Sequence, residues 1–336
     1  WPAMAVRIKV MAKMNIAEQR APQDGRVSLS LTGRQVDFRV ASQITTHGEN
    51  IVLRILDRQK GIVPLEGLGL QTDQLTMLKK MIARPEGMIL VTGPTGSGKT
   101  TTLYSVLNHI NHDGINIMTL EDPVEYPMAL IRQTSVNEAA KLDFANGIRS
   151  LMRQDPDVIL VGEIRDEDTA QMALRAAMTG HQVYSTLHSN SALGAIPRLL
   201  DNGIRPELMA GNIIGIIAQR LVRRLCRHCR QPYQATPIEC QLVGTRPEKA
   251  PVIYRAVGCD HCDYQGYRGR LAIMEILKID GDMDELIAHG ATSRELRKTA
   301  EGKGFRTLAD DGVRRVIDGS TALEELMRVV DLTDRM

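Results

Sequence analysis

The segment Gly93-Pro-Thr-Gly-Ser-Gly-Lys-Thr has the spacing of a phosphate-binding loop, G-x-x-x-x-G-K-[ST]. It lies between a strand-like run, 88–92, and a helix-like run, 101–110. Glycines there let backbone N–H groups surround phosphates, and the helix N-terminus that follows adds a favourable dipole. A flexible glycine-rich turn is the alternative, but the flanking elements favour nucleotide binding. The predicted nucleotide-binding residues are Gly93, Pro94, Thr95, Gly96, Ser97, Gly98, Lys99, Thr100 and Thr101.

Within this loop, two side chains have separate expected roles. Lys99 can reach the β and γ phosphate oxygens, and the Thr100 hydroxyl can ligate magnesium.

Two acidic residues follow apolar runs that are typical of parallel strands. Glu163 ends the run 158–162, and Glu121 ends the run 115–120. Carboxylates at the carboxyl ends of parallel strands face the crevice where ligands bind. Glu163 can orient and deprotonate an attacking water, and Glu121 can help to organise water around a metal ion. The alternative is that such acids cap the following helices, and for Asp166 and Asp168 we favour capping.

His188 stands at the end of another strand-like run, 182–186, where a polar side chain can sense the γ-phosphate. A lone histidine is more often a satisfied structural residue, so both interpretations stay open. Nucleotide hydrolases also use arginines that are supplied across an interface. The chain offers Arg26, Arg39 and Arg54 near its N-terminal strands, and Arg149 and Arg153 before the acidic strand, although such arginines are usually solvated.

Four of the five cysteines form two Cys-x-x-Cys pairs that are separated by 29 residues. Four thiolates satisfy tetrahedral zinc and leave no open position, which indicates a structural site. A redox pair is the main alternative, and the histidine inside each pair could replace a thiolate. Cys240 has no partner and is interpreted as a free thiol. The predicted zinc ligands are Cys226, Cys229, Cys259 and Cys262.

The elements that must position these residues divide the chain into two parts. Residues 1–57 predict a small α+β domain with a helix and strand-like runs at 27–31, 35–40 and 50–56, and 58–69 predict a linker. From residue 70 to 336, helices alternate with apolar strands, which predicts a mostly parallel sheet with helices on its faces. Within this domain, 223–269 predict a cysteine-bearing, loop-rich subdomain and 270–336 a helical one. Because the chain opens within an apparent helix, we expect it to be a piece of a longer protein.

Composition excludes several classes of protein. Apolar residues make up 43% and charged residues 24% of 336 residues, as in soluble globular proteins. Lysine plus arginine exceed aspartate plus glutamate by 42 − 40 = 2, and aromatic residues are only 3%, which weighs against nucleic acid as a partner. In the most apolar region of the chain, the longest uncharged run is 208–219, which is shorter than the roughly 20 residues that span a bilayer.

With these segments in hand, the chain resembles the secretion ATPase superfamily. The resemblance is to its assembly branch, the type II secretion ATPases and type IV pilus extension ATPases. It extends over essentially the whole chain. The matching segments are Gln23–Arg26, Val36–Val40, His47–Glu49, the phosphate loop, the Asp box Glu121–Glu125, the Walker B segment Asp155–Asp166, the His box Gly180–His188, Ala218–Cys226, the cysteine pairs and Gly266–Arg270.

The resemblance implies a RecA-like ATPase domain after a PAS-like N-terminal domain, assembled as a homohexamer. It implies that Glu163 is the general base, that His188 senses the nucleotide state, and that Arg39, Arg54 and Arg149 meet the phosphates. Retraction ATPases of this superfamily typically lack the cysteine pairs, so assembly or secretion is favoured over retraction.

The sequence therefore predicts an ATP hydrolase that uses magnesium and carries zinc. By resemblance, it works in the cytoplasm at the inner membrane, through a membrane platform protein, to assemble a type IV pilus or a type II secretion pseudopilus. The alternative is a nucleic-acid translocase on the same RecA-like fold. The sequence does not distinguish pilus from secretion system, and it leaves ring symmetry, the order of hydrolysis and second-messenger regulation open.

Overall fold

The computed structural model describes residues 1–31, 33–57, 62–137 and 140–335. The chain divides into two compact units, Trp1–Ile62 and Val63–Met336. Residues 58–61 of the expected linker lie outside the described residues. Among the helices of these described ranges, none is long and apolar enough to cross a bilayer.

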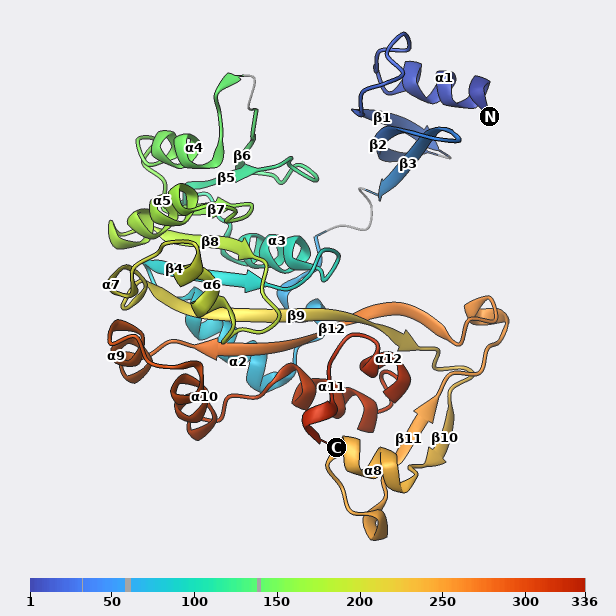
Figure 1. Cartoon of the computed structure of the whole chain (residues 1–336), viewed down its shortest axis with the longest axis vertical. Helices are drawn as coiled ribbons and strands as arrows, with labels where there is room; N and C mark the ends of the chain where they lie inside the picture. The colour runs from blue at the N-terminus through green and yellow to red at the C-terminus, as the bar shows by residue number, and fades with distance from the viewer. Residues whose placement is uncertain (32, 58–61, 138–139, 336) are drawn as a thin grey trace. The chain divides into compact units, whose positions relative to one another are not determined.

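The first unit is a helix with a three-stranded antiparallel sheet of order β1-β2-β3 (Figure 1). A small apolar core of Ala12, Val27 and Val40 joins them. The structure confirms the helix and the three strand-like runs, and Thr32 of the turn between the first two runs lies outside the described residues. The elements are α1 Pro2–Met11, β1 Gln23–Leu31, β2 Arg34–Thr45 and β3 Gly48–Asp57.

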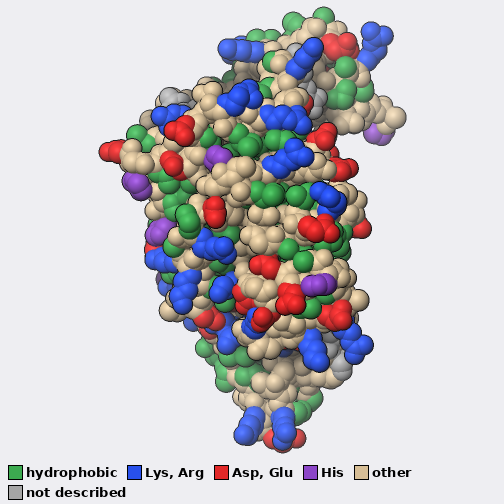
Figure 2. Space-filling view, turned by 90° about the vertical axis from the view of Figure 1, so that its left-hand side faces the viewer, with side chains coloured by type: hydrophobic (Ala, Val, Ile, Leu, Met, Phe, Trp, Pro, Cys, Tyr) green, Lys and Arg blue, Asp and Glu red, His purple; other side chains and the backbone are tan. Residues whose placement is uncertain are grey.

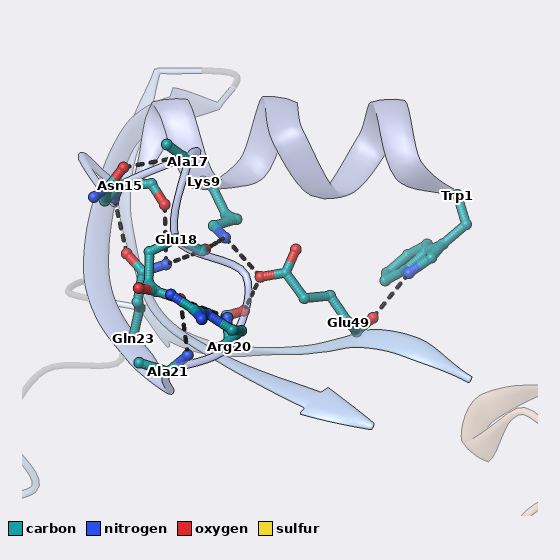
Figure 3. Close-up of polar contacts among 10 residues, drawn as sticks. Trp1, Lys9, Asn15, Ala17, Glu18, Arg20, Ala21, Gln23 and Glu49 are labelled. Carbon is teal, nitrogen blue, oxygen red and sulfur yellow. Dashed lines mark hydrogen bonds and ion pairs between the residues drawn. The ribbon is translucent and has the colours of Figure 1, made fainter. Parts of the chain in front are cut away.

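A buried ion pair fastens α1 to the sheet of this unit (Figure 3). The Lys9 side chain is 1% exposed, and its ammonium lies 2.6 Å from Glu49 Oε1 and also donates to the Glu18 carbonyl at 2.7 Å. Ser42 donates to the same Glu49 oxygen at 2.7 Å. Hydrogen bonds from Lys9 and Ser42 hold the pKa of Glu49 below its usual range. The charge on Lys9 is therefore compensated inside the unit, as a buried ammonium requires.

The second unit is built on a seven-stranded sheet of order β12-β9-β4-β8-β7-β5-β6. All neighbouring strands are parallel except β12, which runs antiparallel to β9. This confirms the expected mostly parallel sheet. Its strands are β4 Gly87–Thr92, β5 Ile117–Glu121, β6 Arg132–Ser135, β7 Val158–Val161, β8 Gln182–Leu187, β9 Ile213–Leu225 and β12 Tyr267–Lys278.

Helices cover both faces of this sheet. The chain passes from β4 to β5 in one direction along the sheet and from β7 to β8 in the other, so right-handed crossovers put α3 and α5 on opposite faces. The helices before the cysteine pairs are α2 Thr72–Ile82, α3 Lys99–Ile110, α4 Phe144–Leu151, α5 Glu167–Met178, α6 Ala195–Asp201 and α7 Pro206–Met209.

The central strands have no exposed face. Every residue of β4, β5, β7 and β8 is buried, which explains their continuous apolar runs. In Figure 1, β4 and β8 run side by side with their arrowheads at the same edge. The residues that follow these strands therefore meet at one edge of the sheet.

The prediction that residues 270–336 are helical is wrong for 270–278, which belong to β12. Glu275 of this strand lies opposite Ala218 of β9. Residues 271–277 are buried on both faces, so they show no alternation, and an apolar run of this kind cannot be told from a helix by periodicity. The helices expected after it are confirmed as α9 Gly281–Ala288, α10 Ser293–Gly302, α11 Leu308–Ile317 and α12 Leu323–Met327.

The segment between β9 and β12 has more regular structure than the loop-rich expectation. Strands β10 and β11 pair antiparallel, and α8 lies between them in sequence. Cys240 is fully buried on α8 and is a free thiol, as expected. The bounds are β10 Gln231–Gln234, α8 Pro237–Val243 and β11 Val252–Arg255, and short 3-10 helices span Leu65–Leu68, Pro247–Lys249, Asp260–Cys262 and Thr333–Arg335.

Charged side chains of both signs are interspersed on the face of the molecule that Figure 2 shows. This agrees with the net charge of +2.

Candidate active site

The phosphate loop leaves the carboxyl end of β4 and leads directly into α3. Gly93, Gly96 and Gly98 have φ angles of +144°, +78° and +91°, which side-chain-bearing residues rarely adopt. A Cβ on Gly93 would also lie 2.5 Å from the Gln219 carbonyl oxygen. Gly96 and the two glycines that the motif requires are therefore the residues that let this backbone close into a loop.

Lys99 folds back onto its own loop. Its ammonium donates to the carbonyl of Gly93 at 2.8 Å and to that of Pro94 at 3.3 Å. Burial lowers the pKa of Lys99, and the charge of Glu163 acts in the opposite direction. The two carbonyls thus hold the Lys99 ammonium against its own loop.

The motif says nothing of Gln219, a fully buried residue of β9 that supports the loop from below. Its amide nitrogen donates to the Ser97 carbonyl at 2.7 Å, and its amide oxygen accepts from the Thr102 hydroxyl at 2.8 Å. One side chain thus joins the phosphate loop to the first turn of α3. Two sequence signals point to it: a polar residue within the apolar run 213–222, and its place in the matching segment Ala218–Cys226.

Glu163 and His188 meet at the carboxyl edge of the sheet, as the sequence predicts for residues that follow parallel strands. Glu163 Oε2 lies 3.4 Å from His188 Nε2. The Glu163 side chain is 21% exposed, so water can reach it. A carboxylate in this position can accept a proton from a water molecule.

Arg165 is a third member of this group, and sequence analysis missed it. It forms an ion pair with Glu163 and lies 3.1 Å from Asp122. The hydrogen bond to Glu163 raises the pKa of Arg165. Glu163 is thus held between a guanidinium group and the His188 imidazole.

Glu121 lies beside Gly162 but turns its carboxylate inward. A Cβ on Gly162 would lie 3.2 Å from the Glu121 Cα. The side chain accepts hydrogen bonds from the hydroxyls of Tyr104 and Thr119 and, at 3.3 Å, from the Gln133 amide. Burial raises the pKa of Glu121. All three of its hydrogen-bond partners are neutral side chains of the protein.

The arginines that the sequence analysis singles out lie on different elements. Arg149 is exposed on α4 and donates to Asn146 at 2.8 Å. In the first unit, Arg26, Arg39 and Arg54 lie directly opposite one another across β1, β2 and β3. Residues opposite one another share a face of the sheet, so these three form a basic row. Asp166 caps α5 by accepting from the Thr169 N–H at 2.7 Å, which confirms the capping interpretation for Asp166, whereas Asp168 lies within the first turn of the helix.

Thr100 is exposed in the first turn of α3, on the same edge of the sheet as Glu163. A hydroxyl and a nearby carboxylate are oxygen donors of the kind that magnesium prefers alongside phosphate. The residues present therefore fit this ion.

The four paired cysteines converge on one point. All four sulfur atoms lie within 4.8 Å of one another, and three Sγ–Sγ distances are 3.9, 3.8 and 3.8 Å. Tetrahedral zinc with bonds of about 2.3 Å places sulfur atoms about 3.8 Å apart. Burial alone would raise the pKa of Cys262, but N–H groups of Cys259 and Gly266 lower it to about 7. The cluster therefore fits zinc.

Comparison with known proteins gives the family. A model of the family described as "Type II/IV secretion system protein" matches residues 2–328. The chain is 49% identical over 323 residues to the type II secretion system protein E of Pseudomonas aeruginosa, and 47% identical over 323 residues to the type II secretion system ATPase E of Vibrio cholerae. Each match covers 96% of this chain and 64% of the relative, so the chain spans less than two thirds of their length.

Two solved structures share the fold. The pilus retraction motor PilT with bound ADP has a TM-score of 0.69 at 28% identity, over 94% of this chain and 80% of that one. The ATPase DotB of Legionella pneumophila has a TM-score of 0.66 at 23% identity, over 92% of this chain and 77% of that one. These likenesses agree with the family match, and the chain belongs to the type II/IV secretion system protein family.

Proposed function

We propose that the chain is the ATP-hydrolysing motor part of a type II secretion or type IV pilus assembly ATPase. The observation that carries the proposal is the meeting of a phosphate loop with Glu163 and His188 at one edge of a parallel sheet. The relative from Vibrio cholerae that is named an ATPase, and the PilT structure with ADP, support the same reaction.

In this mechanism, the γ-phosphate draws Lys99 away from the carbonyls of Gly93 and Pro94. Glu163 leaves Arg165 and accepts the proton of the attacking water. His188, 3.4 Å from Glu163 before the reaction, responds to the presence or loss of the γ-phosphate. Magnesium, with Thr100 as a ligand, would supply positive charge against the phosphate oxygens.

Arginines of the N-terminal unit complete the proposal. Arg39 and Arg54, from neighbouring positions of one sheet, can place two guanidinium groups against phosphates, and Arg149 can approach from α4. Arginine suits this role because its planar donors bind phosphate oxygens in pairs. We infer that closing and opening of the PAS-like N-terminal unit on the RecA-like ATPase domain couples loss of the γ-phosphate to motion.

The motor would work as a homohexamer at the cytoplasmic face of the inner membrane, where its motion drives a platform protein that adds subunits to a fibre. The names of the relatives favour a type II secretion pseudopilus over a pilus. The cysteine cluster, with bound zinc, would stabilise the subdomain at the ends of β9 and β12.

Two substitutions test the reaction. Lys99→Ala should lower ATP turnover at least about a hundredfold through loss of phosphate binding. Glu163→Gln should lower turnover about as much while bound ATP is retained, because an amide cannot accept the proton. Lys80→Ala and Glu167→Gln remove exposed charges elsewhere on the domain and serve as controls. Turnover near that of the unmodified protein in either test variant contradicts the proposed function.

A further inference from the structure

The loop 188–194, between β8 and α6, carries His188 and is held by residues outside its own neighbourhood in sequence. At its start, the Ser189 N–H donates to the Thr92 hydroxyl of β4 at 2.8 Å. That hydroxyl also donates to the Leu187 carbonyl at 2.8 Å. The first residues of the loop are thus fixed to the strand that leads into the phosphate loop.

The middle of the loop is held by Arg220 of β9. One guanidinium nitrogen donates to the Asn190 carbonyl at 3.0 Å, and the other donates to the Gln219 carbonyl at 3.1 Å. The second nitrogen would lie 3.3 Å from a Cβ on Gly93, so the group borders the phosphate loop. Within the described ranges, no carboxylate forms an ion pair with Arg220.

The end of the loop is held by Glu275 of β12, which is 3% exposed. One carboxylate oxygen accepts the Ala192 N–H at 2.5 Å. The other accepts the Leu308 N–H, at the start of α11, at 2.8 Å. Among the residues that the structure describes, this buried carboxylate has no cation at ion-pair distance, so two main-chain donors carry its compensation.

Arg220 and Glu275 lie on the same two-stranded ribbon. Their strands β9 and β12 are antiparallel neighbours, seen side by side in Figure 1. Glu275 lies opposite Ala218, two residues from Arg220, and the opposite charges of the two side chains attract each other. The β9–β12 ribbon thus presents a cation to a loop carbonyl and an anion to a loop N–H.

We propose that Arg220 and Glu275 are positioning residues, which fix the loop 188–194 from the β9–β12 ribbon and so place His188 against Glu163. This inference rests on the proposed function of His188. It also gives a reason for a buried charge at residue 275, since leucine or methionine there would fill the space without orienting the loop.

A double-mutant cycle on ATP turnover tests the positioning role. Glu275→Gln keeps the shape but replaces one acceptor oxygen by an NH₂ group, which cannot accept from an N–H. Arg220→Gln shortens the side chain that donates to the Asn190 carbonyl. Arg220 is half-exposed, so this substitution tests the positioning role with less risk to folding. Each variant should lower kcat about tenfold and change KM for ATP less than about threefold.

In a His188→Ala background, the same two substitutions should change kcat less than about twofold, because they act through His188. The full tenfold loss in that background overturns the proposal. Arg224→Gln on β9 and Glu285→Gln on α9 remove exposed charges of the same type and should leave kcat unchanged in both backgrounds.

Amide hydrogen exchange separates this inference from the proposed function. Without nucleotide, both test variants should exchange the amides of 189–194 about tenfold faster, since each loses a hydrogen bond that fixes the loop. Unchanged exchange there overturns the positioning role. Faster exchange together with normal turnover of His188→Ala keeps the positioning role and contradicts the sensor role of His188.

Discussion

At the scale of residues, substitutions of Glu121 and Tyr104 distinguish a catalytic role of the Glu121 carboxylate from a structural one. If Glu121 organises water at the metal, Glu121→Gln should lower kcat at least about tenfold, because the negative charge is lost. Tyr104→Phe removes one hydroxyl from the same carboxylate but leaves its charge, and it should change kcat less than about threefold while lowering stability by about 1–2 kcal/mol. Steady-state turnover and chemical denaturation measure the two effects.

Equal losses of kcat in Glu121→Gln and Tyr104→Phe would contradict the catalytic role. They would instead mean that the buried hydrogen-bond cluster around Glu121 only holds the end of β5 in place.

Sequence patterns could locate the site residues that directly follow strands. Glu163 and His188 meet because parallel strands end at one edge, a rule that needs no side-chain detail. Arg165 and Arg220 could not be found in this way. Their contacts depend on how a loop returns and on which strand lies next to β4, which are properties of tertiary packing.

At the scale of elements, the cysteine cluster makes a prediction about metal content. We expect about one equivalent of zinc per chain by elemental analysis of reductively purified protein, because the sulfur geometry matches a tetrahedral site. Cys259→Ser should lose the metal and lower the unfolding midpoint of its subdomain. Cys240→Ser on α8 is the matched control, since this thiol lies outside the four-cysteine cluster and donates to the Ala235 carbonyl. Absence of metal in the unmodified protein would rule out the zinc site.

Helix α12 is fastened to β9 by an ion pair that should make stability depend on pH. Glu325 has a fully buried side chain that accepts from Arg223 and Arg328. Burial alone would raise the pKa of Glu325, but these two guanidinium groups lower it to about 2.

Because this folded pKa lies below the unfolded one, the stabilisation is complete above about pH 4.5 and is lost as pH falls toward about 2. A shift of this size corresponds to about 3 kcal/mol. The free energy of unfolding of Glu325→Gln should therefore lie below that of the unmodified protein at pH 6, and the gap should shrink as the pH falls. Glu324→Gln, an exposed neighbour, is the control. A gap that stays constant with pH would show that the carboxylate is not responsible.

Strands and helices with a clear period were predictable, and β12 was not. The three N-terminal strand-like runs alternate, and α9 to α12 keep a helical spacing of buried residues. Residues 271–277 have neither period, because both faces of this part of β12 are buried and the strand is paired with β9 along its length. An apolar run without a period indicates burial and leaves the element type open.

At the scale of the whole molecule, the sequence indicates two units, and Trp1–Ile62 and Val63–Met336 are each compact. Each unit buries its own core, so each has its own sequence pattern. Strands with alternating polar and apolar residues mark the first unit, and helices that alternate with apolar strands mark the second. The arrangement of subunits in a ring could not be predicted from such patterns. It depends on surfaces that composition describes only by a net charge of +2.

The central claim is that ATP hydrolysis by this chain drives a protein platform. The most direct test measures ATP turnover of the purified chain alone, with single-stranded DNA, and with the cytoplasmic part of a type II secretion platform protein. The account predicts that the platform protein raises turnover and that DNA does not. Stimulation by DNA without stimulation by the platform protein would contradict the account and identify a nucleic-acid translocase on the same fold.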